Sequence, residues 1–123
     1  MLSAILPAVT LTLEHLAPKE YSVNTIIASF RIIEGKEAEA EEAIRKHTAA
    51  VEANEPGALA YIFHRRPKDP ALVTVFEVYA DDEAVAAHRD SQHQAAFGKL
   101  FGAVFDPATV KIERQERVSG FSR

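Results

Sequence analysis

The sequence predicts one α+β domain built in the order strand, helix, strand, strand, helix, strand. Its 123 residues are enough for a single hydrophobic core. Four segments are rich in β-branched or aromatic residues, and the segments between them repeat apolar residues every three or four positions. The order in which these two kinds of segment alternate is that of the split βαβ, or ferredoxin-like, arrangement (βαββαβ).

The first strand and the first helix are each marked by composition. Residues 23–33 contain many β-branched side chains and no Gly or Pro, which predicts a strand with apolar residues on both faces. Residues 36–54 are rich in Ala and Glu, which predicts a helix. Its buried stripe is expected to consist of Ala40, Ile44, His47 and Val51. Pro56 and Gly57 end this helix, because the residue before a Pro disfavours the helical conformation and Gly allows a sharp turn.

A β-hairpin is predicted next. Residues 58–66 and 71–80 contain the Val, Phe and Tyr side chains that are typical of a sheet. Between them, the Pro-Lys-Asp-Pro sequence of residues 67–70 is typical of a reverse turn. The two segments should therefore pair as neighbouring antiparallel strands.

The second helical region is predicted in two parts. Asp81 or Asp82 caps the first part, and the Asp-Ser pair that ends at Ser91 offers a break and a second cap. One side of the second part is expected to consist of His93, Phe97, Leu100 and Val104. Pro107 is expected to end the helix. Residues 109–118 alternate apolar and polar side chains, which predicts a last strand with one solvent-exposed face.

The domain is expected to cover residues 23–118, between an N-terminal extension of residues 1–22 and a tail of residues 119–123. The extension is apolar, but it lacks the positive charges that begin a secretory signal, and it is too short for a helix that crosses a bilayer. Three of the four strands are apolar on both faces, whereas the helices can cover only one face of the sheet. A second copy of the sheet is the natural cover for the other face, so the pattern predicts a homodimer.

Composition excludes several classes of function. A formal net charge of −4 with scattered basic residues argues against a nucleic-acid partner, and no segment predicts a membrane span. The chain has no cysteine, which excludes thiolate catalysis and Cys-ligated metals and fits a reducing cytoplasm, where we expect the protein. No Gly-x-Gly-x-x-Gly motif follows a strand, so a nicotinamide or flavin cofactor is not expected.

The middle of the chain carries a recognisable series of motifs. They are the Glu55-Pro56-Gly57 helix stop, Tyr61 in the next strand, the Pro67 to Pro70 turn, Glu77-x-Tyr79, and the series Ala87-His88-x-x-Ser91-x-His93-x-x-x-Phe97. This pattern resembles the antibiotic biosynthesis monooxygenase family, whose members form dimeric α+β barrels, and the resemblance covers nearly the whole of residues 23–118. The resemblance therefore implies the same fold and the same homodimer.

The family resemblance implies one of several chemistries on this fold. The preferred hypothesis is oxygenation of a phenolic or quinol-type small molecule, with O2 as the second substrate. This reaction would use no cofactor and no metal. Such an enzyme needs a base and an apolar cavity, because the deprotonated substrate itself reduces oxygen. Haem-degrading relatives use an Asn, a Trp and a His where this chain has Ala28, His88 and Gly98, so that chemistry is disfavoured.

Two other functions stay open. The first is isomerisation of a small phosphorylated carbonyl compound, to which residues 76–93 are similar and for which Arg65 and Arg66 could bind the phosphate. The second is a non-catalytic dimer that binds a hydrophobic ligand. Oxygen uptake without added cofactor distinguishes the oxygenase from both alternatives, and a phosphate-dependent stabilisation would favour the isomerase.

Histidine is the natural base near neutral pH, and His88 and His93 are the preferred candidates. Five positions apart, they would not share a face of an unbroken helix, but a break before Ser91 could turn both toward a cavity. His64 is expected to meet solvent or the dimer partner. No pair of histidines has the four-residue helical spacing of metal ligands, so a zinc site is not expected.

The remaining candidate substrate-binding residues are Tyr61, Phe63, Glu77, Tyr79, His47, Phe97 and Asn24. A Glu on a largely buried strand must be paired or have a raised pKa. We expect Glu77 to form an ion pair across the dimer interface, for instance with Arg31 or Arg65, and a role as base or as a partner of the base is the alternative. His47 on the buried stripe is interpreted as a core residue, with a place on the cavity wall as the alternative.

Overall fold

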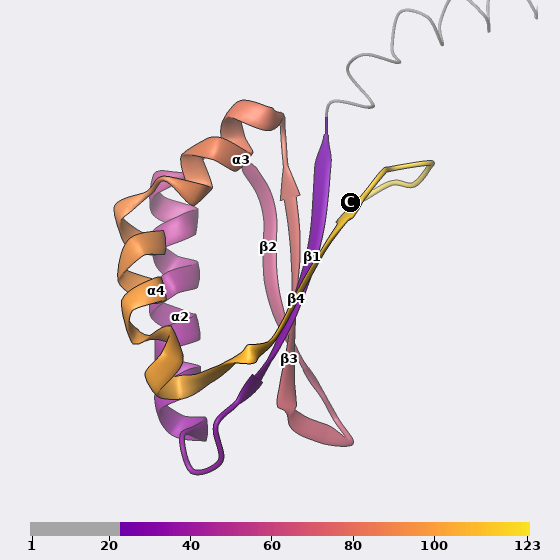
Figure 1. Ribbon diagram of the computed structural model, residues 1–123. Helices are drawn as coiled ribbons and strands as arrows, with labels where there is room; N and C mark the ends of the chain where they lie inside the picture. Colours follow the sequence, from indigo (N-terminus) through magenta and orange to yellow (C-terminus); the bar gives the residue numbers. More distant parts are fainter. Residues whose placement is uncertain (1–22) are drawn as a thin grey trace, which may run out of the picture.

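The computed structural model describes residues 23–123, and the predicted extension of residues 1–22 lies outside this range. The domain has two layers: a four-stranded antiparallel sheet and three helices that all pack on one face of it (Figure 1). The elements are β1 (Asn24–Ile32), α2 (Glu37–Asn54), β2 (Ala58–Arg66), β3 (Asp69–Tyr79), α3 (Asp82–Arg89), α4 (Gln92–Val104) and β4 (Phe105–Gln115). The strand order β2-β3-β1-β4 confirms the predicted ferredoxin-like fold.

The last strand differs from the prediction. It was expected over residues 109–118, but β4 begins at Phe105 and ends at Gln115, and residues 116–123 are irregular. The register between β1 and β4 shifts after Ser29, and the Arg31 amide donates to the Thr109 hydroxyl at 2.9 Å. This irregularity accommodates Pro107, which has no amide hydrogen to donate.

Two polar caps produce the predicted break between α3 and α4. The Asp81 side chain accepts from the Ala84 amide at 2.8 Å, and the Ser91 hydroxyl accepts from the Gln94 amide at 3.1 Å. The Ser91 hydroxyl also donates to the His88 carbonyl at 2.8 Å. The chain therefore turns sharply between the two helices, and the residues on either side of the turn are held in place.

The core lies between the helices and the inner face of β1 and β3. Its buried cluster consists of Ala28, Phe30, Ile32, Ala40, Val73, Val75, Phe97, Val104 and Phe105. Phe30 packs edge-on against both Phe101 and Phe105, with ring centroids 5.0 and 4.8 Å apart. Phe30, Phe101 and Phe105 thus form one aromatic cluster next to the start of β4.

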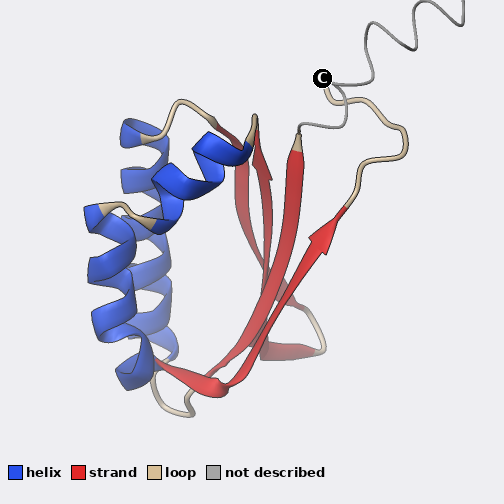
Figure 2. Ribbon diagram, turned by 45° about the horizontal axis from the view of Figure 1, so that its top comes forward, coloured by secondary structure: helices blue, strands red, loops and turns tan. Residues whose placement is uncertain are grey.

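The outer face of the sheet is bare of helices (Figure 2). Ile62 and Phe76 are directly opposed on this face, and they are 49% and 36% exposed. Leu59 on the same hairpin is 59% exposed. Exposed apolar side chains on adjacent strands are typical of a surface that a partner protein covers.

The start of β2 passes close to α3, and this contact requires Gly57. A Cβ atom added at Gly57 would lie 2.6 Å from the Ala84 Cβ, and the Gly57 carbonyl accepts from the Ala80 amide at 2.9 Å. We therefore expect Gly57→Ala to destabilise the domain by about 1–3 kcal/mol, because the backbone on both sides must move. Gly98→Ala is the matched control, since nothing lies within 4 Å of its added Cβ, and it should stabilise α4 by about 1 kcal/mol. Urea unfolding of both variants measures the difference, and equal stability would contradict the close packing.

Candidate functional site

A cavity of about 550 Å³ lies between the sheet and the helices. Its apolar lining is Ile26, Ala28, Phe30, Phe63, Val75, Val85, Phe97, Phe101, Val110 and Ile112. Its polar lining is Tyr61, Glu77, Tyr79, His88, Arg89 and Gln94. A space of this size, mostly apolar with a few polar groups, is typical of a small-molecule site.

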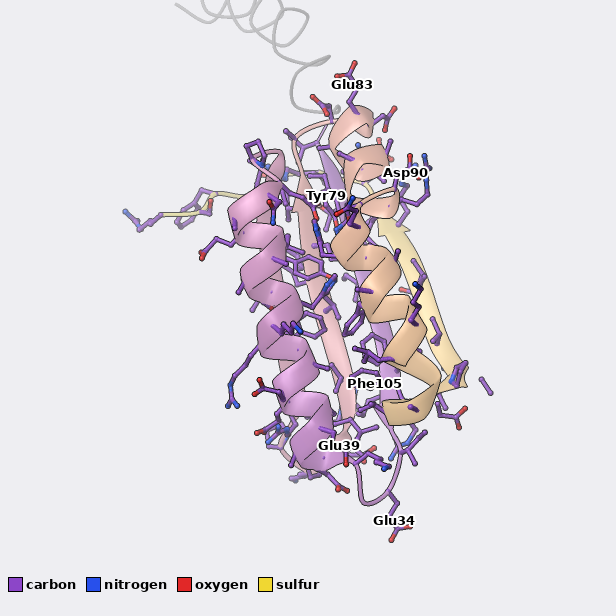
Figure 3. The ribbon with its side chains drawn as sticks, turned by 90° about the vertical axis from the view of Figure 1, so that its left-hand side faces the viewer. Glu34, Glu39, Tyr79, Glu83, Asp90 and Phe105 are labelled. Atoms are coloured by element: carbon purple, nitrogen blue, oxygen red, sulfur yellow. The ribbon has the colours of Figure 1, made fainter. Side chains whose placement is uncertain are left out.

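The polar groups gather at the end of the cavity that is closed by α3. In Figure 3 Tyr79 lies between α2 and α4 near this end, while Phe105 lies toward the opposite end. The His88 ring packs against both phenols, with centroids 5.2 Å from Tyr61 and 5.4 Å from Tyr79. The cavity therefore has one polar end and one apolar end.

His88 is held by a buried carboxylate. Glu55 is the residue that follows α2, where its amide caps the helix by donating to the Val51 carbonyl, and it is only 7% exposed. Its two carboxylate oxygens lie 3.0 and 3.1 Å from Nδ1 of His88. A carboxylate can only accept, so this contact places the His88 proton on Nδ1.

The opposite nitrogen of His88 is left for other partners. Within residues 23–123, Nε2 makes no hydrogen bond, and the His88 side chain lines the cavity. A carboxylate that fixes the tautomer of an imidazole and leaves its other nitrogen as an acceptor is the arrangement of a general base. The geometry suits His88 for accepting a proton from a molecule in the cavity.

His93 binds the same carboxylate from the other side. Nε2 of His93 hydrogen bonds to Oε2 of Glu55, and the two imidazole rings are 6.4 Å apart. The break at Ser91 does bring the two histidines together, although His93 does not line the cavity. Glu55, His88 and His93 are also the group in residues 23–123 that could hold a metal ion, with donor atoms within 4.8 Å of one another.

His47 lies behind the cavity wall. Its Nε2 is 3.1 Å from the Tyr61 hydroxyl, its ring stacks on Phe97 at 4.3 Å, and it is 4% exposed. Phe97 and Tyr61 line the cavity, while His47 itself does not. His47 thus supports two side chains of the wall from the helix side.

Burial lowers the pKa of His47 to about 4, because a charged ring is poorly solvated there and the rings of His88 and His93 add repulsion. The unfolded chain then binds more protons than the folded chain between about pH 6.5 and 4, so this group stabilises the fold fully only above about pH 6.5. We expect acidification through this window to remove up to about 3 kcal/mol of the free energy of unfolding. His47→Gln should flatten this part of the stability curve in urea unfolding at several pH values, whereas an unchanged slope would contradict the assignment.

Glu77 does not form the ion pair that the sequence suggested. It lies on the inner face of β3, where the Tyr79 hydroxyl donates to its carboxylate, whereas Arg31 pairs with Asp69 and Arg65 with Glu41. That prediction was wrong, because the side chain points into the cavity and not toward the outer face. Burial raises the pKa of Glu77, which makes its carboxyl a hydrogen-bonding group of the cavity wall.

The predicted site residues divide into three groups. Tyr61, Phe63, Glu77, Tyr79, His88 and Phe97 line the cavity. His47 and His93 lie behind them and contact them or their partners. Asn24 lies apart, at the start of β1, where its amide donates to Asp82 at 3.0 Å.

Sequence reasoning missed Glu55 and Gln94 as members of the site. Glu55 was interpreted only as part of a helix stop, although an acidic residue directly before Pro56 at a buried helix end was the available signal. Gln94 is one turn before Phe97 on α4 and reaches the cavity, and its residue type alone gave no indication. The spacing argument against a metal site concerned ligands on one helix, whereas the three donors here come from α3, α4 and the end of α2.

On one side the cavity is lined by residues of α4 and of the edge strand β4. Ile112 on β4 lines it and is 69% exposed, and Gly98 on α4 lines it with open space beside its backbone. Arg89, at the end of α3, is the cation of the lining, and it pairs with Asp90.

Comparisons with known proteins agree with this arrangement. The sequence profile of the family described as "Antibiotic biosynthesis monooxygenase" matches residues 24–100. Among curated proteins, no sequence matches the chain. None of the helices in residues 23–123 is long and apolar enough to cross a membrane.

Several solved structures share the fold. A protein of Caulobacter crescentus, proposed to be an antibiotic biosynthesis monooxygenase, is 26% identical with a TM-score of 0.75, over 86% of this chain and 99% of that chain. A Pseudomonas aeruginosa protein is 26% identical with a TM-score of 0.72, over 81% and 98% of the two chains. A Mycobacterium tuberculosis protein shares the fold at 18% identity, with a TM-score of 0.73 over 82% and 100%.

Proposed function

Since the chain belongs to the antibiotic biosynthesis monooxygenase family, we propose that it is a cofactor-independent monooxygenase that oxidises a phenolic or quinol-type small molecule. The family and the cavity together support an oxygenase-like or ligand-binding role. The observation that carries the proposal further is the contact between Glu55 and Nδ1 of His88, a side chain that lines the cavity and whose Nε2 makes no hydrogen bond within residues 23–123.

The two ends of the cavity match the two parts of such a substrate. The apolar end, with Phe63, Phe97 and Phe101, suits an aromatic ring system. The polar end suits a hydroxyl group, with His88 as acceptor and the Glu77–Tyr79 pair as hydrogen-bonding neighbours. When the ring of a phenol packs against the aromatic wall, its hydroxyl would lie among these polar groups.

The reaction needs no reductant other than the substrate. His88 accepts the phenolic proton, and the resulting electron-rich anion passes electrons to O2, which then bonds to the ring carbon as a peroxide. The peroxide takes the proton back from His88 and becomes a hydroperoxide, which returns His88 to its neutral form. Loss of water from the hydroperoxide leaves a carbonyl group. For a hydroquinone the sum is one quinol plus one O2 to one hydroxyquinone plus one water, so four electrons leave the substrate and four reduce oxygen. The apolar wall keeps bulk water from the reacting carbon.

The isomerase alternative loses the phosphate ligands that the sequence suggested for it. Arg65 and Arg66, the proposed phosphate ligands, do not line it, and Arg65 is already paired with Glu41. A ligand-binding dimer without catalysis remains the second candidate, because the cavity alone would serve both roles. The Glu55–His88 contact favours the enzyme, since binding alone does not need a fixed imidazole tautomer.

We further propose that the protein acts as a homodimer in the cytoplasm. The exposed outer-face residues Leu59, Ile62 and Phe76 support a sheet-to-sheet interface, in which two copies cover each other. The absence of cysteine from the whole chain supports a reducing compartment.

Oxygen consumption tests the proposed function. Purified protein, treated with a chelator, is incubated with a panel of hydroquinones and anthrones while dissolved oxygen and product spectra are followed. We expect uptake of one O2 per substrate oxidised, without nicotinamide or flavin, for at least one member of the panel. Uptake equal to the buffer blank for every compound, combined with saturable binding of one of them, would support the ligand-binding role instead.

A further inference from the structure

We infer that Glu55, His88 and His93 form a binding site for one divalent transition-metal ion, and that the bound ion blocks the base. The binding part of this inference stands on the geometry of the three side chains, and the blocking part rests on the proposed function. All three side chains are mostly buried: Glu55, His88 and His93 are 5, 10 and 15% exposed.

The donor set converges on one point. The Glu55 oxygens lie 3.0 and 3.1 Å from Nδ1 of His88, Nε2 of His93 hydrogen bonds to the same carboxylate, and all the donor atoms are within 4.8 Å of one another. Ligands of a tetrahedral zinc ion with bonds of about 2.0–2.2 Å are separated by roughly 3.3 Å. Small side-chain movements therefore suffice to admit an ion between the carboxylate and the two rings.

The type of donor selects the type of ion. Two imidazoles and one carboxylate suit Zn²⁺, Co²⁺ or Ni²⁺, whereas Mg²⁺ and Ca²⁺ prefer sites built from oxygen alone. Three protein ligands leave a further position for water or an exogenous group. A hydrogen-bonded carboxylate between two imidazoles is the metal-free form of the same cluster.

The backbone holds the donors before an ion binds. Glu55 is fixed by its capping amide bond to Val51, and the turn between the two histidines is fixed by the Ser91 hydroxyl, which bonds to the His88 carbonyl. The site is thus built from the ends of three helices, which these two hydrogen bonds hold in place. Such preorganisation lowers the cost of ordering ligands around an ion.

A metal on Nδ1 changes what His88 can do. Without metal, Glu55 accepts the Nδ1 proton and Nε2 is free to take a proton from the cavity. When Nδ1 binds an ion, the neutral ring carries its proton on Nε2, and this nitrogen can then only donate. The ion and the substrate proton therefore compete for the same imidazole, so we expect zinc to inhibit the metal-free enzyme.

Calorimetry with zinc chloride tests the binding. Chelator-treated full-length protein should bind one Zn²⁺ per chain, and Co²⁺ should give the visible spectrum of a nitrogen- and oxygen-ligated site. Saturating zinc, at about 100 times its dissociation constant, should raise Tm by roughly 10 °C. His93→Gln should weaken binding by at least about 100-fold, and Glu55→Gln should weaken it similarly, each checked for folding by circular dichroism.

His64→Gln is the matched control, because it removes an exposed histidine outside the cluster and should bind zinc as the unmodified protein does. Absence of stoichiometric binding at micromolar zinc, or equal binding by His93→Gln, would overturn the site. In the oxygen assay, zinc should inhibit the unmodified protein but not His93→Gln. An enzyme that is active both with and without bound zinc would contradict the blocking role, while an enzyme inactive in both forms would count against the proposed function and leave the binding result intact.

Discussion

His88→Gln is expected to lower kcat for oxygen consumption by about 10²- to 10⁴-fold, the usual contribution of a positioned general base. The amide of Gln can still reach the cavity and can still hydrogen bond to Glu55, but it cannot accept a proton from the substrate at neutral pH. Binding should change little, because the aromatic wall around Phe63 and Phe97 is untouched. Oxygen electrode rates at saturating substrate measure the effect.

The matched control for this substitution is His64→Gln, an exposed histidine on β2 that does not line the cavity. Its rate should stay within about twofold of the unmodified protein, since surface substitutions away from a site have small effects. Raising the pH should partly rescue His88→Gln, because the substrate then ionises in solution. A His88→Gln enzyme with full activity at neutral pH would remove His88 from the mechanism.

Ile62→Glu is expected to convert the proposed homodimer into a monomer. Ile62 is 49% exposed in the single subunit, so the charge is solvated there, but in a sheet-to-sheet dimer it would be buried opposite Phe76 without a partner. We expect the dissociation constant of the dimer to rise by at least about 100-fold, since an unpaired buried charge costs several kcal/mol. Sedimentation velocity at micromolar protein reports the change.

Ala53→Glu provides the same change of charge on the exposed face of α2. This variant should remain a dimer of unchanged stability. If the unmodified protein sediments as a monomer at micromolar concentration, or if Ile62→Glu stays dimeric, the outer face of the sheet is not the interface.

Most of the fold could be predicted because local patterns and overall packing agree. The strand β2 was predicted with its observed bounds, and residue type predicted a cap at Asp81 or Asp82, of which Asp81 is observed, and a second cap at Ser91. The start of β4 could not be predicted in the same way. Pro107 is a sound signal for the end of a helix, but the pairing of Phe105 with Ile32 depends on a register shift that no local pattern encodes.

The candidate site was predicted less completely, because some of its residues are far apart in the sequence and meet only in the folded domain. His88 was found because histidine is an uncommon residue with distinctive chemistry, and its neighbours Tyr61 and Tyr79 because they alternate on predicted strands. Glu55 was missed, since its partners lie 33 and 38 positions away along the chain and only the folded domain brings them together. The Glu77 ion pair was wrong because a strand pattern shows which residues share a face but not which face meets the helices.

The spectrum of a chromogenic phenol bound in the absence of oxygen tests most directly whether His88 accepts the substrate proton. At a pH below the pKa of the free phenol, chelator-treated protein should convert the bound ligand to its phenolate, which appears as a new absorption band. The His88→Gln variant should bind the same phenol in its neutral form. A phenolate band of equal size in both proteins, or its absence from both while the ligand is bound, would contradict the account.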